Sequence, residues 1–169
     1  MDTDYNVEDL FERYSDMVYR IAISYGNHIQ MAEDIVQDVF LRVLKNKPTF
    51  KSRDHEKAWF VRVTVNCCKS MLSSAWFRRI RPLEDAEEIL GIFCGTEELE
   101  LYETLKMLPA KYRIVLYLRY YEEYQVKEIA DMLHILPNTV SARLARAKKM
   151  MKQEILKNKE DEYHEKRFI

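Results

Sequence analysis

Residues 126–149 read VKEIADMLHILPNTVSARLARAKK and are the most informative segment of the chain. It contains two runs of apolar side chains at helical spacing, separated by a short segment that ends at Pro137. Ala130 is the small residue at which two such helices cross closely. The apolar positions with the spacing to fill a shared core are Ile129, Leu133, Ile135, Val140 and Leu144. This pattern predicts a helix-turn-helix.

The second of these helices has a polar side suited to DNA. The residues that point away from the shared core near its start are Asn138, Thr139, Ser141, Ala142, Arg143 and Arg146. In a helix-turn-helix, such positions meet base edges and phosphates in the major groove. Lys148, Lys149 and Lys152 continue the helix with side chains suited to phosphates. A plain helical hairpin with a solvated basic face is the alternative, but no acidic residue occurs between Val140 and Glu154, which favours DNA binding.

The rest of the chain also has helical spacing. The 169 residues contain only 3 Gly and 4 Pro, fewer than the turns of a sheet-rich fold need. Gly26 is expected to end the first helix, and residues 47–55 are expected to form a loop. The first three predicted helices cover 7–25, a segment from a cap at Asn27 to about Asn46, and roughly 55–77 after a cap at Asp54. A short helix is predicted after a cap at Thr96, and three more are predicted over about 109–121, 125–133 and 137–155.

The charges alternate along the chain although the formal net charge is only −1. Residues 1–50 carry 5 basic and 9 acidic side chains, and residues 51–81 carry 8 and 2. Residues 82–106 carry 1 and 8, and residues 107–156 carry 9 and 5. This asymmetry indicates separate surfaces with separate partners rather than a uniformly solvated exterior.

Several classes of protein and site are not expected. No apolar run approaches the roughly 18 residues of a membrane span, so membrane insertion is not expected. The acidic start of the chain does not resemble a signal peptide, which predicts a cytoplasmic protein. The 3 cysteines include the adjacent Cys67 and Cys68, and we expect buried free thiols rather than a disulfide framework. Because the 4 histidines are scattered, no metal site, cofactor or catalytic residue is predicted.

Two stretches resemble the extracytoplasmic-function group of bacterial RNA polymerase sigma factors. Residues 32–43, AEDIVQDVFLRV, are similar to the helix of sigma region two that contacts the polymerase clamp. Residues 108–122, LPAKYRIVLYLRYYE, followed by the helix-turn-helix, are similar to sigma region four. The resemblance covers about 7–79 and 98–153. It implies an all-α fold of two small helical domains, 1–81 and 98–156, joined by an acidic linker over 82–97. The resemblance does not cover the tail over 157–169, whose run of mixed charges predicts that it frays.

The resemblance implies which residues bind core RNA polymerase. In this family, the polar side of the region-two helix binds the clamp helices of the largest polymerase subunit. Solvation is the alternative for a helix side rich in acidic residues, but an exposed Leu41 among charges favours a protein contact. The corresponding residues are Asp34, Gln37, Asp38, Leu41 and Arg42.

The basic segment over 51–81 corresponds to the part of region two that recognises and melts the minus-ten promoter element. The implied phosphate contacts are Lys57, Arg62, Lys69, Arg78 and Arg79. The residues implied to hold a flipped base are Phe50, Lys51, Ser52, Arg53, Asp54 and Asn66. Trp59 is expected to lie in the core rather than to act as a melting aromatic, and for Phe60 both interpretations stay open.

The helix-turn-helix corresponds to the reader of the minus-thirty-five element. His134 stands where the family usually has glycine, and Leu136 stands where it usually has a Ser or Thr cap. His134 is expected to take a left-handed backbone, and Pro137 is expected to open the second helix. Ser141 and Ala142 differ from the family's usual basic residue and serine, so no promoter sequence is predicted.

The partners implied by the resemblance are core RNA polymerase, duplex and locally melted promoter DNA, and an anti-sigma factor. The acidic segment over 84–103 is implied to run near the polymerase's template channel. One alternative is a helix-turn-helix regulator that acts without polymerase and uses 1–81 for dimerisation or sensing. Another is a helical enzyme with Glu33, Asp34 and Asp38 as metal ligands, but these residues lack histidine partners.

Overall fold

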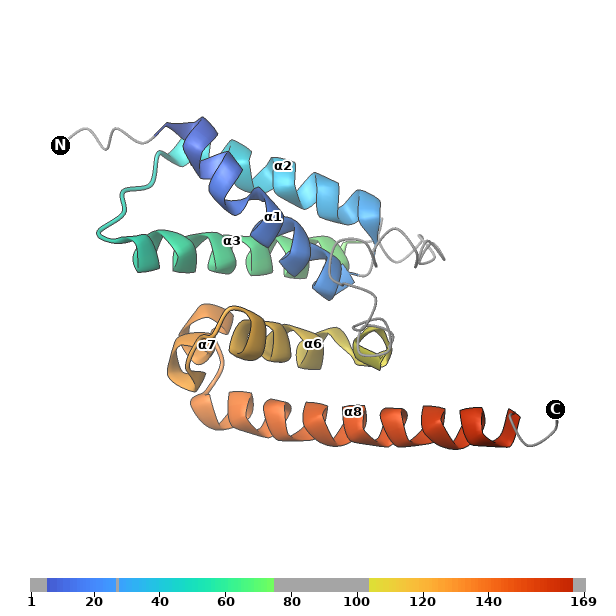
Figure 1. Cartoon of the computed structure of the whole chain (residues 1–169). Coiled ribbons are helices and arrows are strands. Elements are labelled where there is room, and N and C mark those ends of the chain that lie inside the picture. The colour runs from blue at the N-terminus through green and yellow to red at the C-terminus, as the bar shows by residue number, and fades with distance from the viewer. Residues whose placement is uncertain (1–5, 27, 75–103, 166–169) are drawn as a thin grey trace. The chain divides into compact units, whose positions relative to one another are not determined.

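The computed structural model describes residues 6–26, 28–74 and 104–165, and the regular elements in these ranges are helices (Figure 1). The chain divides into two compact units, Met1–Phe93 (unit 1) and Cys94–Ile169 (unit 2). The prediction of an all-α fold with two small helical domains is therefore confirmed. The predicted acidic linker over 82–97 and the Thr96 cap lie outside the described residues.

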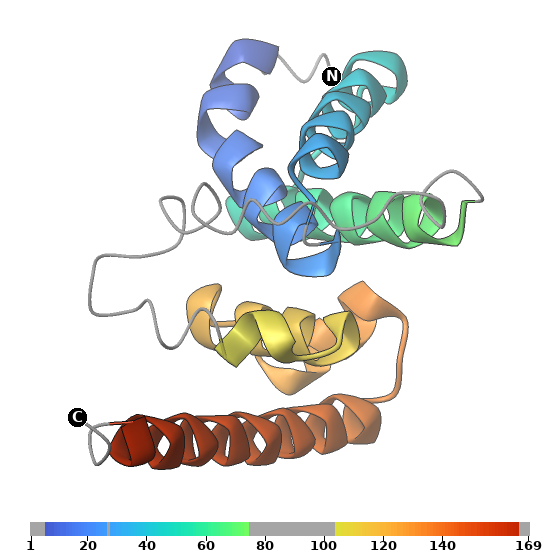
Figure 2. The same cartoon turned by 90° about the vertical axis from the view of Figure 1, so that its right-hand side faces the viewer.

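The described part of unit 1 consists of α1 (Val7–Gly26), α2 (Ile29–Asn46) and α3 (Arg53–Ser73). In both views α1 and α2 lie on the same side of α3 (Figure 1, Figure 2). Phe60 of α3 is fully buried where the three helices meet, with its ring 4.4 Å from that of Tyr14 and 5.5 Å from that of Phe40. Burial of one such side chain contributes roughly 2–3 kcal/mol, so Phe60 is a main anchor of α3. The other side chains of this core include Leu10, Val18, Ile21, Ile35, Val39, Val43 and Val65.

Two helices of unit 1 begin at caps other than those predicted. His28, not Asn27, caps α2, because its Nδ1 accepts a hydrogen bond from the Met31 backbone N–H at 3.3 Å. Ser52, not Asp54, caps α3, because its hydroxyl accepts from the His55 N–H at 3.1 Å. Several capping residues compete near each start, and only the backbone path decides which side chain reaches a free N–H group. The predicted loop consequently ends at Ser52.

The ends of α1 and α3 also differ from prediction. Gly26 is the last residue of α1 and does not have a left-handed backbone, so it is not a C′ glycine. A Cβ atom at Gly26 would instead meet the thioether of the buried Met31, so that side chain would have to shift. The helix α3 ends at Ser73, short of the predicted residue 77, because Ser74 takes an extended backbone.

Unit 2 contains a helical turn over 104–107, followed by α6 (Ala110–Leu116), the π-helix η2 (Tyr117–Tyr121), α7 (Val126–Leu133) and α8 (Pro137–Glu165). The long helix α8 packs against both α6 and α7 and so holds the unit together. The buried side chains that join these elements include Leu108, Ile114, Val115, Leu118, Ile129, Leu133, Val140, Leu144 and Ala147.

For unit 2, one predicted helix has the expected extent but changes type, and one prediction was wrong. The helix expected over 109–121 is α-helical only to Leu116 and then widens into η2, where the Glu122 N–H donates to the Tyr117 carbonyl at 3.1 Å. The charged tail was expected to fray from Lys157, but α8 continues to Glu165. Residues 151–165 contain neither Gly nor Pro and are rich in Lys and Glu, which are strong helix formers, so nothing local stops the helix.

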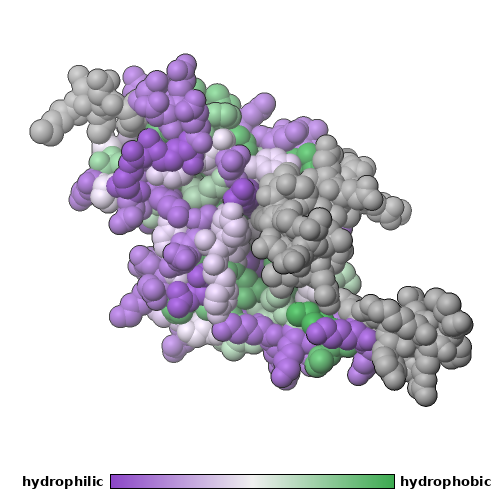
Figure 3. All heavy atoms as spheres, viewed as in Figure 1, coloured by the Kyte–Doolittle hydropathy of each residue, from purple (hydrophilic) through white to green (hydrophobic). Residues whose placement is uncertain are grey.

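The face of the molecule drawn in Figure 3 carries mainly hydrophilic side chains, with apolar side chains in smaller groups between them. No helix among the described residues is both long enough and apolar enough to span a bilayer.

Candidate nucleic-acid and protein interfaces

The helix-turn-helix forms as predicted from α7, a tight turn and α8. The Gln125 N–H donates to the Glu128 carboxylate at 2.7 Å and so fixes the start of α7. His134 has φ 53° and ψ 47°, the left-handed backbone expected at this position. The Leu136 carbonyl accepts from the Val140 N–H at 3.2 Å in the first turn of α8. The predicted shared core is buried except for Ile135, which is half-buried.

The outer side of α8 carries most of the predicted DNA-contacting residues. Asn138, Ala142 and Lys149 are exposed and share one side of the helix, because they are separated by four and seven residues. Ser141 and Lys148 share the adjacent side for the same reason. The exposed set is completed by Arg146 and Lys152, whereas Thr139 and Arg143 are half-buried. Of the two arginines, Arg146 is therefore the better placed to reach DNA.

In unit 1, α3 presents a polar stripe. Arg62, Asn66 and Lys69 are exposed at intervals of four and three residues, so they lie on one side of the helix. Lys57 is half-buried and lies five residues before Arg62, which places it on a different side of α3. The structure thus separates Lys57 from the other predicted phosphate contacts of α3, while the predicted Arg78 and Arg79 lie outside the described residues.

Aromatic side chains support the loop that precedes α3. Phe50 is half-buried, with its ring edge-on to Trp59 at 5.8 Å and to His55 at 6.1 Å. Trp59 is itself half-buried rather than in the core, three residues before Arg62 on the stripe. Phe60 is fully buried, which settles its role as a core residue. Phe50 therefore anchors the loop, and Trp59, three residues before Arg62, lies on the side of α3 that carries the polar stripe.

The backbone of the same loop is held in place by hydrogen bonds. The Lys51 N–H donates to Nδ1 of His55 at 3.2 Å, and the hydroxyl of Ser52 caps α3 as described above. The side chains of Lys51, Ser52 and Arg53 are exposed beside this turn. The loop thus combines a fixed backbone with accessible polar side chains.

A buried carboxylate that sequence reasoning missed fixes the start of α3 on α1. Oε1 of Glu56 accepts hydrogen bonds from Arg13 Nη1 at 2.6 Å and from the Tyr14 hydroxyl at 2.8 Å. Arg53 Nη1 lies 3.7 Å from the same oxygen. Burial, followed by the hydrogen bond to Glu56, raises the pKa of Tyr14 to about 12. The hydrogen-bond donors to Glu56 are 42 and 43 residues away along the chain, so residue spacing gave no signal of this network.

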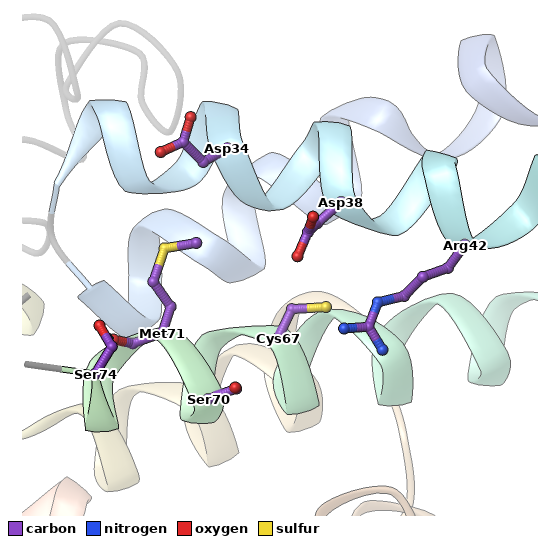
Figure 4. A pocket seen from close by; sticks show the side chains of 7 residues that line it. All are labelled: Asp34, Asp38, Arg42, Cys67, Ser70, Met71 and Ser74. Carbon is purple, nitrogen blue, oxygen red and sulfur yellow. The ribbon is translucent and has the colours of Figure 1, made fainter. Parts of the chain in front are cut away.

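On the charged side of α2, some residues line a hollow against α3 and others lie outside it. Asp34, Asp38 and Arg42 line a hollow of about 400 Å³, whose other side is formed by Cys67, Ser70 and Met71 of α3 and by Ser74 just after it. Asp38 and Arg42 extend from α2 toward Cys67 (Figure 4). Gln37 and Leu41 instead lie exposed outside this hollow, and Leu41 is 60% exposed. The predicted polymerase-binding residues thus share one side of α2, here called the open face, and three of them also line the charged hollow. The open face consists of Asp34, Gln37, Asp38, Leu41 and Arg42.

Cys67 and Cys68 are packed thiols rather than reactive groups. Cys67 and Cys68 are free and buried, as predicted. Burial raises the pKa of both thiols, and for Cys67 the nearby Arg42 opposes this while Asp38 adds to it. A raised thiol pKa disfavours the nucleophilic thiolate. Among the described residues, no three His, Cys, Asp or Glu side chains are grouped to hold a metal ion.

Comparison with known proteins gives these two units a family. The family model for sigma-70 region 2 matches residues 10–78, and the model for sigma-70 region 4 matches residues 98–151. The RNA polymerase sigma factor SigV of Bacillus subtilis (strain 168) is 32% identical over 143 residues, which cover 82% of this chain and 84% of SigV. The chain belongs to the sigma-70 family of RNA polymerase sigma factors.

This sigma factor is of the extracytoplasmic-function (ECF) group. The ECF sigma factor SigW of Bacillus subtilis (strain 168) is 25% identical, with 87% of each chain covered. The fold matches the sigma factor RpoE, solved in complex with the anti-sigma factor NepR from Bartonella quintana, at a TM-score of 0.68 and 18% identity, covering 88% of this chain and 95% of that chain. CnrH, solved with the cytosolic domain of CnrY, matches at a TM-score of 0.62 and 20% identity, covering 88% and 86%.

The family fixes the general function. A sigma factor joins RNA polymerase and directs promoter-specific initiation of transcription, so this chain is a transcription initiation factor. The alternative of a regulator that acts without polymerase is not favoured. The helix-turn-helix recognised from sequence is the end of the region-four match, and the polar side of α2 lies within the region-two match.

Proposed function

We propose that the open face of α2 is where this sigma factor binds core RNA polymerase. The observation that carries this proposal is Leu41, a large apolar side chain that is 60% exposed among charged residues. Asp34, Asp38 and Arg42 form no ion pair with another described residue, so their charges are available to a partner. Together with Gln37 they make a face with an apolar centre and a polar rim, the usual composition of a protein interface.

For the minus-ten element, we assign the loop before α3 and the polar stripe on α3. Arg62 and Lys69 supply phosphate contacts, and Asn66 between them is available to a base edge. Lys51, Ser52 and Arg53 border the site of a flipped base, while Phe50 holds the loop on Trp59. Arg78, Arg79 and Lys57 stay assigned to sequence-independent phosphate contacts.

For the minus-thirty-five element, we assign the outer side of α8. Asn138, Ser141, Ala142 and Arg146 face the bases, and Lys148 and Lys149 face the flanking phosphates. Thr139 and Arg143, which are half-buried, support this edge from the side. The small Ser141 and Ala142 give a shallow reading surface.

The domain functions follow from these assignments. Residues 1–81 bind polymerase and the minus-ten element, 98–156 bind the minus-thirty-five element, and 82–97 link them. The acidic segment over 84–103 runs near the template channel, and charge reversal at Glu87, Glu88, Glu97 and Glu98 is expected to change transcript yield or the pattern of abortive products. Unchanged yield and pattern would exclude that role.

We further propose that the protein acts in the cytoplasm, has no catalytic activity of its own, and is held inactive by an anti-sigma factor. Support for that partner comes from the two solved sigma factors of similar fold, one in complex with the anti-sigma factor NepR and one with the cytosolic domain of CnrY. A partner that covers the face of α2 would block polymerase without altering the fold.

The decisive experiment is capture of core polymerase by the tagged full chain, followed by transcription of a genomic library. Gln37→Arg and Asp38→Arg are expected to abolish capture, because each places a positive charge on the proposed interface. Asp16→Arg makes the same charge change on the exposed side of α1 and should leave capture intact. Arg146→Ala should spare capture and change promoter choice. Failure of the wild type to capture polymerase would overturn the assignment.

A further inference from the structure

Tyr120 of η2 lies directly against the proposed DNA-binding helix. Its side chain is 56% exposed, and Nζ of Lys148 on α8 is 5.1 Å from the centre of its ring. This distance is within the range of a cation–π interaction. A tyrosine in one element therefore holds a lysine in another that is 28 residues later in the chain.

The π-helix gives Tyr120 a fixed support. The Tyr117 hydroxyl donates to Glu122 Oε1 at 2.7 Å. Arg119 Nη1 donates to the Tyr124 carbonyl at 3.1 Å. These bonds tie Tyr117 and Arg119 to the residues that follow η2, so Tyr120 belongs to a turn that is held by side-chain hydrogen bonds.

Lys148 lies where a phosphate contact is needed. It follows Ser141 by seven residues, so both are on one side of α8 and are about 10 Å apart along the helix axis. The major groove is about 12 Å wide, so a residue at that distance from the bases reaches the phosphates that border the groove. A free lysine side chain loses rotamer entropy when it is fixed. A ring that already restrains Lys148 reduces that loss.

We propose that Tyr120 is a positioning residue for promoter binding: its ring holds the ammonium group of Lys148 in place to contact the phosphate backbone beside the minus-thirty-five element. This inference rests on the proposed function of α8. The hydroxyl of Tyr120 is not required, and neither is the neighbouring Tyr121, although it is 52% exposed in the same π-helix.

The test uses holoenzyme reconstituted with the full chain and a promoter fragment that the wild-type holoenzyme selects from the genomic library. Promoter affinity is measured by transcript yield against holoenzyme concentration at several KCl concentrations. Lys148→Ala should weaken binding and reduce the slope of log affinity against log salt by about 1. Tyr120→Leu should weaken binding about two- to five-fold, the effect of losing a cation–π contact. In the Lys148→Ala background, Tyr120→Leu should have no further effect.

Two controls separate positioning from general damage. Tyr120→Phe keeps the ring and should retain wild-type affinity, whereas Tyr121→Leu disturbs the same π-helix and should leave the salt dependence unchanged. The inference is overturned if Tyr120→Leu matches wild type, if Tyr120→Phe is as weak as Tyr120→Leu, if Tyr121→Leu is equally weak, or if Tyr120→Leu acts equally with and without Lys148.

Failure of the underlying assignment looks different. If Arg146→Ala leaves promoter choice unchanged, or if the wild-type holoenzyme selects no promoter, the proposed function of α8 fails and the role of Tyr120 fails with it. If wild-type selection and the effect of Arg146→Ala are both as expected, a negative result at Tyr120 counts against the positioning role alone.

Discussion

Replacement of Glu56 is expected to loosen unit 1 at the loop assigned to the minus-ten element. This carboxylate is 9% exposed and accepts hydrogen bonds from Arg13 and from the Tyr14 hydroxyl. It is the charged tie between α1 and the first turn of α3, which follows directly on the loop over 47–52. Glu56→Gln keeps the shape but removes the charge, whereas Glu56→Ala removes both hydrogen bonds and leaves the Tyr14 hydroxyl buried.

The magnitudes follow from the two bonds. A hydrogen bond to a charged group contributes roughly 1.5–3 kcal/mol, compared with about 1 kcal/mol for a neutral one. The side chain of Arg13 is 34% exposed, so solvent screens part of its share. Glu56→Gln should therefore lower the free energy of unfolding of unit 1 by about 1–2 kcal/mol. Glu56→Ala should lower it by about 2–4 kcal/mol, because it also leaves an unsatisfied buried hydroxyl.

Urea unfolding followed by tryptophan fluorescence measures this loss. Both tryptophans of the chain, Trp59 and Trp76, precede residue 94, so the signal reports on unit 1. Glu128→Gln, which changes an exposed carboxylate of unit 2 that also accepts a hydrogen bond, should leave the transition in place. A loss below about 0.5 kcal/mol for Glu56→Ala, a value typical of surface substitutions, would refute the reasoning.

Three further substitutions test other parts of the fold. Burial and Glu56 raise the pKa of Tyr14 to about 12, so as the pH rises the unfolded chain loses the Tyr14 hydroxyl proton before the folded chain does. The free energy of unfolding of unit 1 should therefore fall between about pH 10 and pH 12, and it should fall less steeply in Tyr14→Phe. Gly26→Ala should destabilise unit 1 by about 1–3 kcal/mol in the same urea assay, because the added Cβ meets Met31; an unchanged midpoint would show that Met31 moves freely. His134→Gly should stabilise unit 2 by about 0.5–1 kcal/mol in thermal unfolding by circular dichroism, since it relieves a left-handed backbone; destabilisation would mean that the imidazole has a role of its own.

The parts of the structure that were predicted correctly depend on short-range patterns. Spacings of three and four residues place the helices, and the left-handed His134 and the opening Pro137 follow from their places between two amphipathic runs. The predicted helix caps Asn27 and Asp54 were wrong, because several capping residues lie within a few positions of the start of each helix. The predicted end of α8 was wrong, because a run of mixed charges was interpreted as a frayed tail although Lys and Glu are also good helix formers.

The candidate sites divide in the same way. Periodicity predicted the polar side of α8 and an exposed Leu41 on α2. It did not show that Arg143 is half-buried, because that depends on what packs beside α8, whereas the spacing of five residues from Lys57 to Arg62 already places Lys57 off the polar stripe of α3. Of the two adjacent aromatics on α3, Phe60 is in the core and Trp59 is near the surface, and one residue of helix rotation decides between them.

The helical class, the helix-turn-helix and the sigma-70 family could all be predicted from the sequence alone, because each is expressed in residues that are close along the chain. Other features arise only from the packing of the helices: Asp38 and Arg42 line a hollow against α3, Glu56 ties α3 to α1, and Lys148 lies over the ring of Tyr120. These contacts join residues about 25 to 43 positions apart. Their existence depends on the angle and rotation at which helices cross, which the spacing of apolar residues within one helix does not specify.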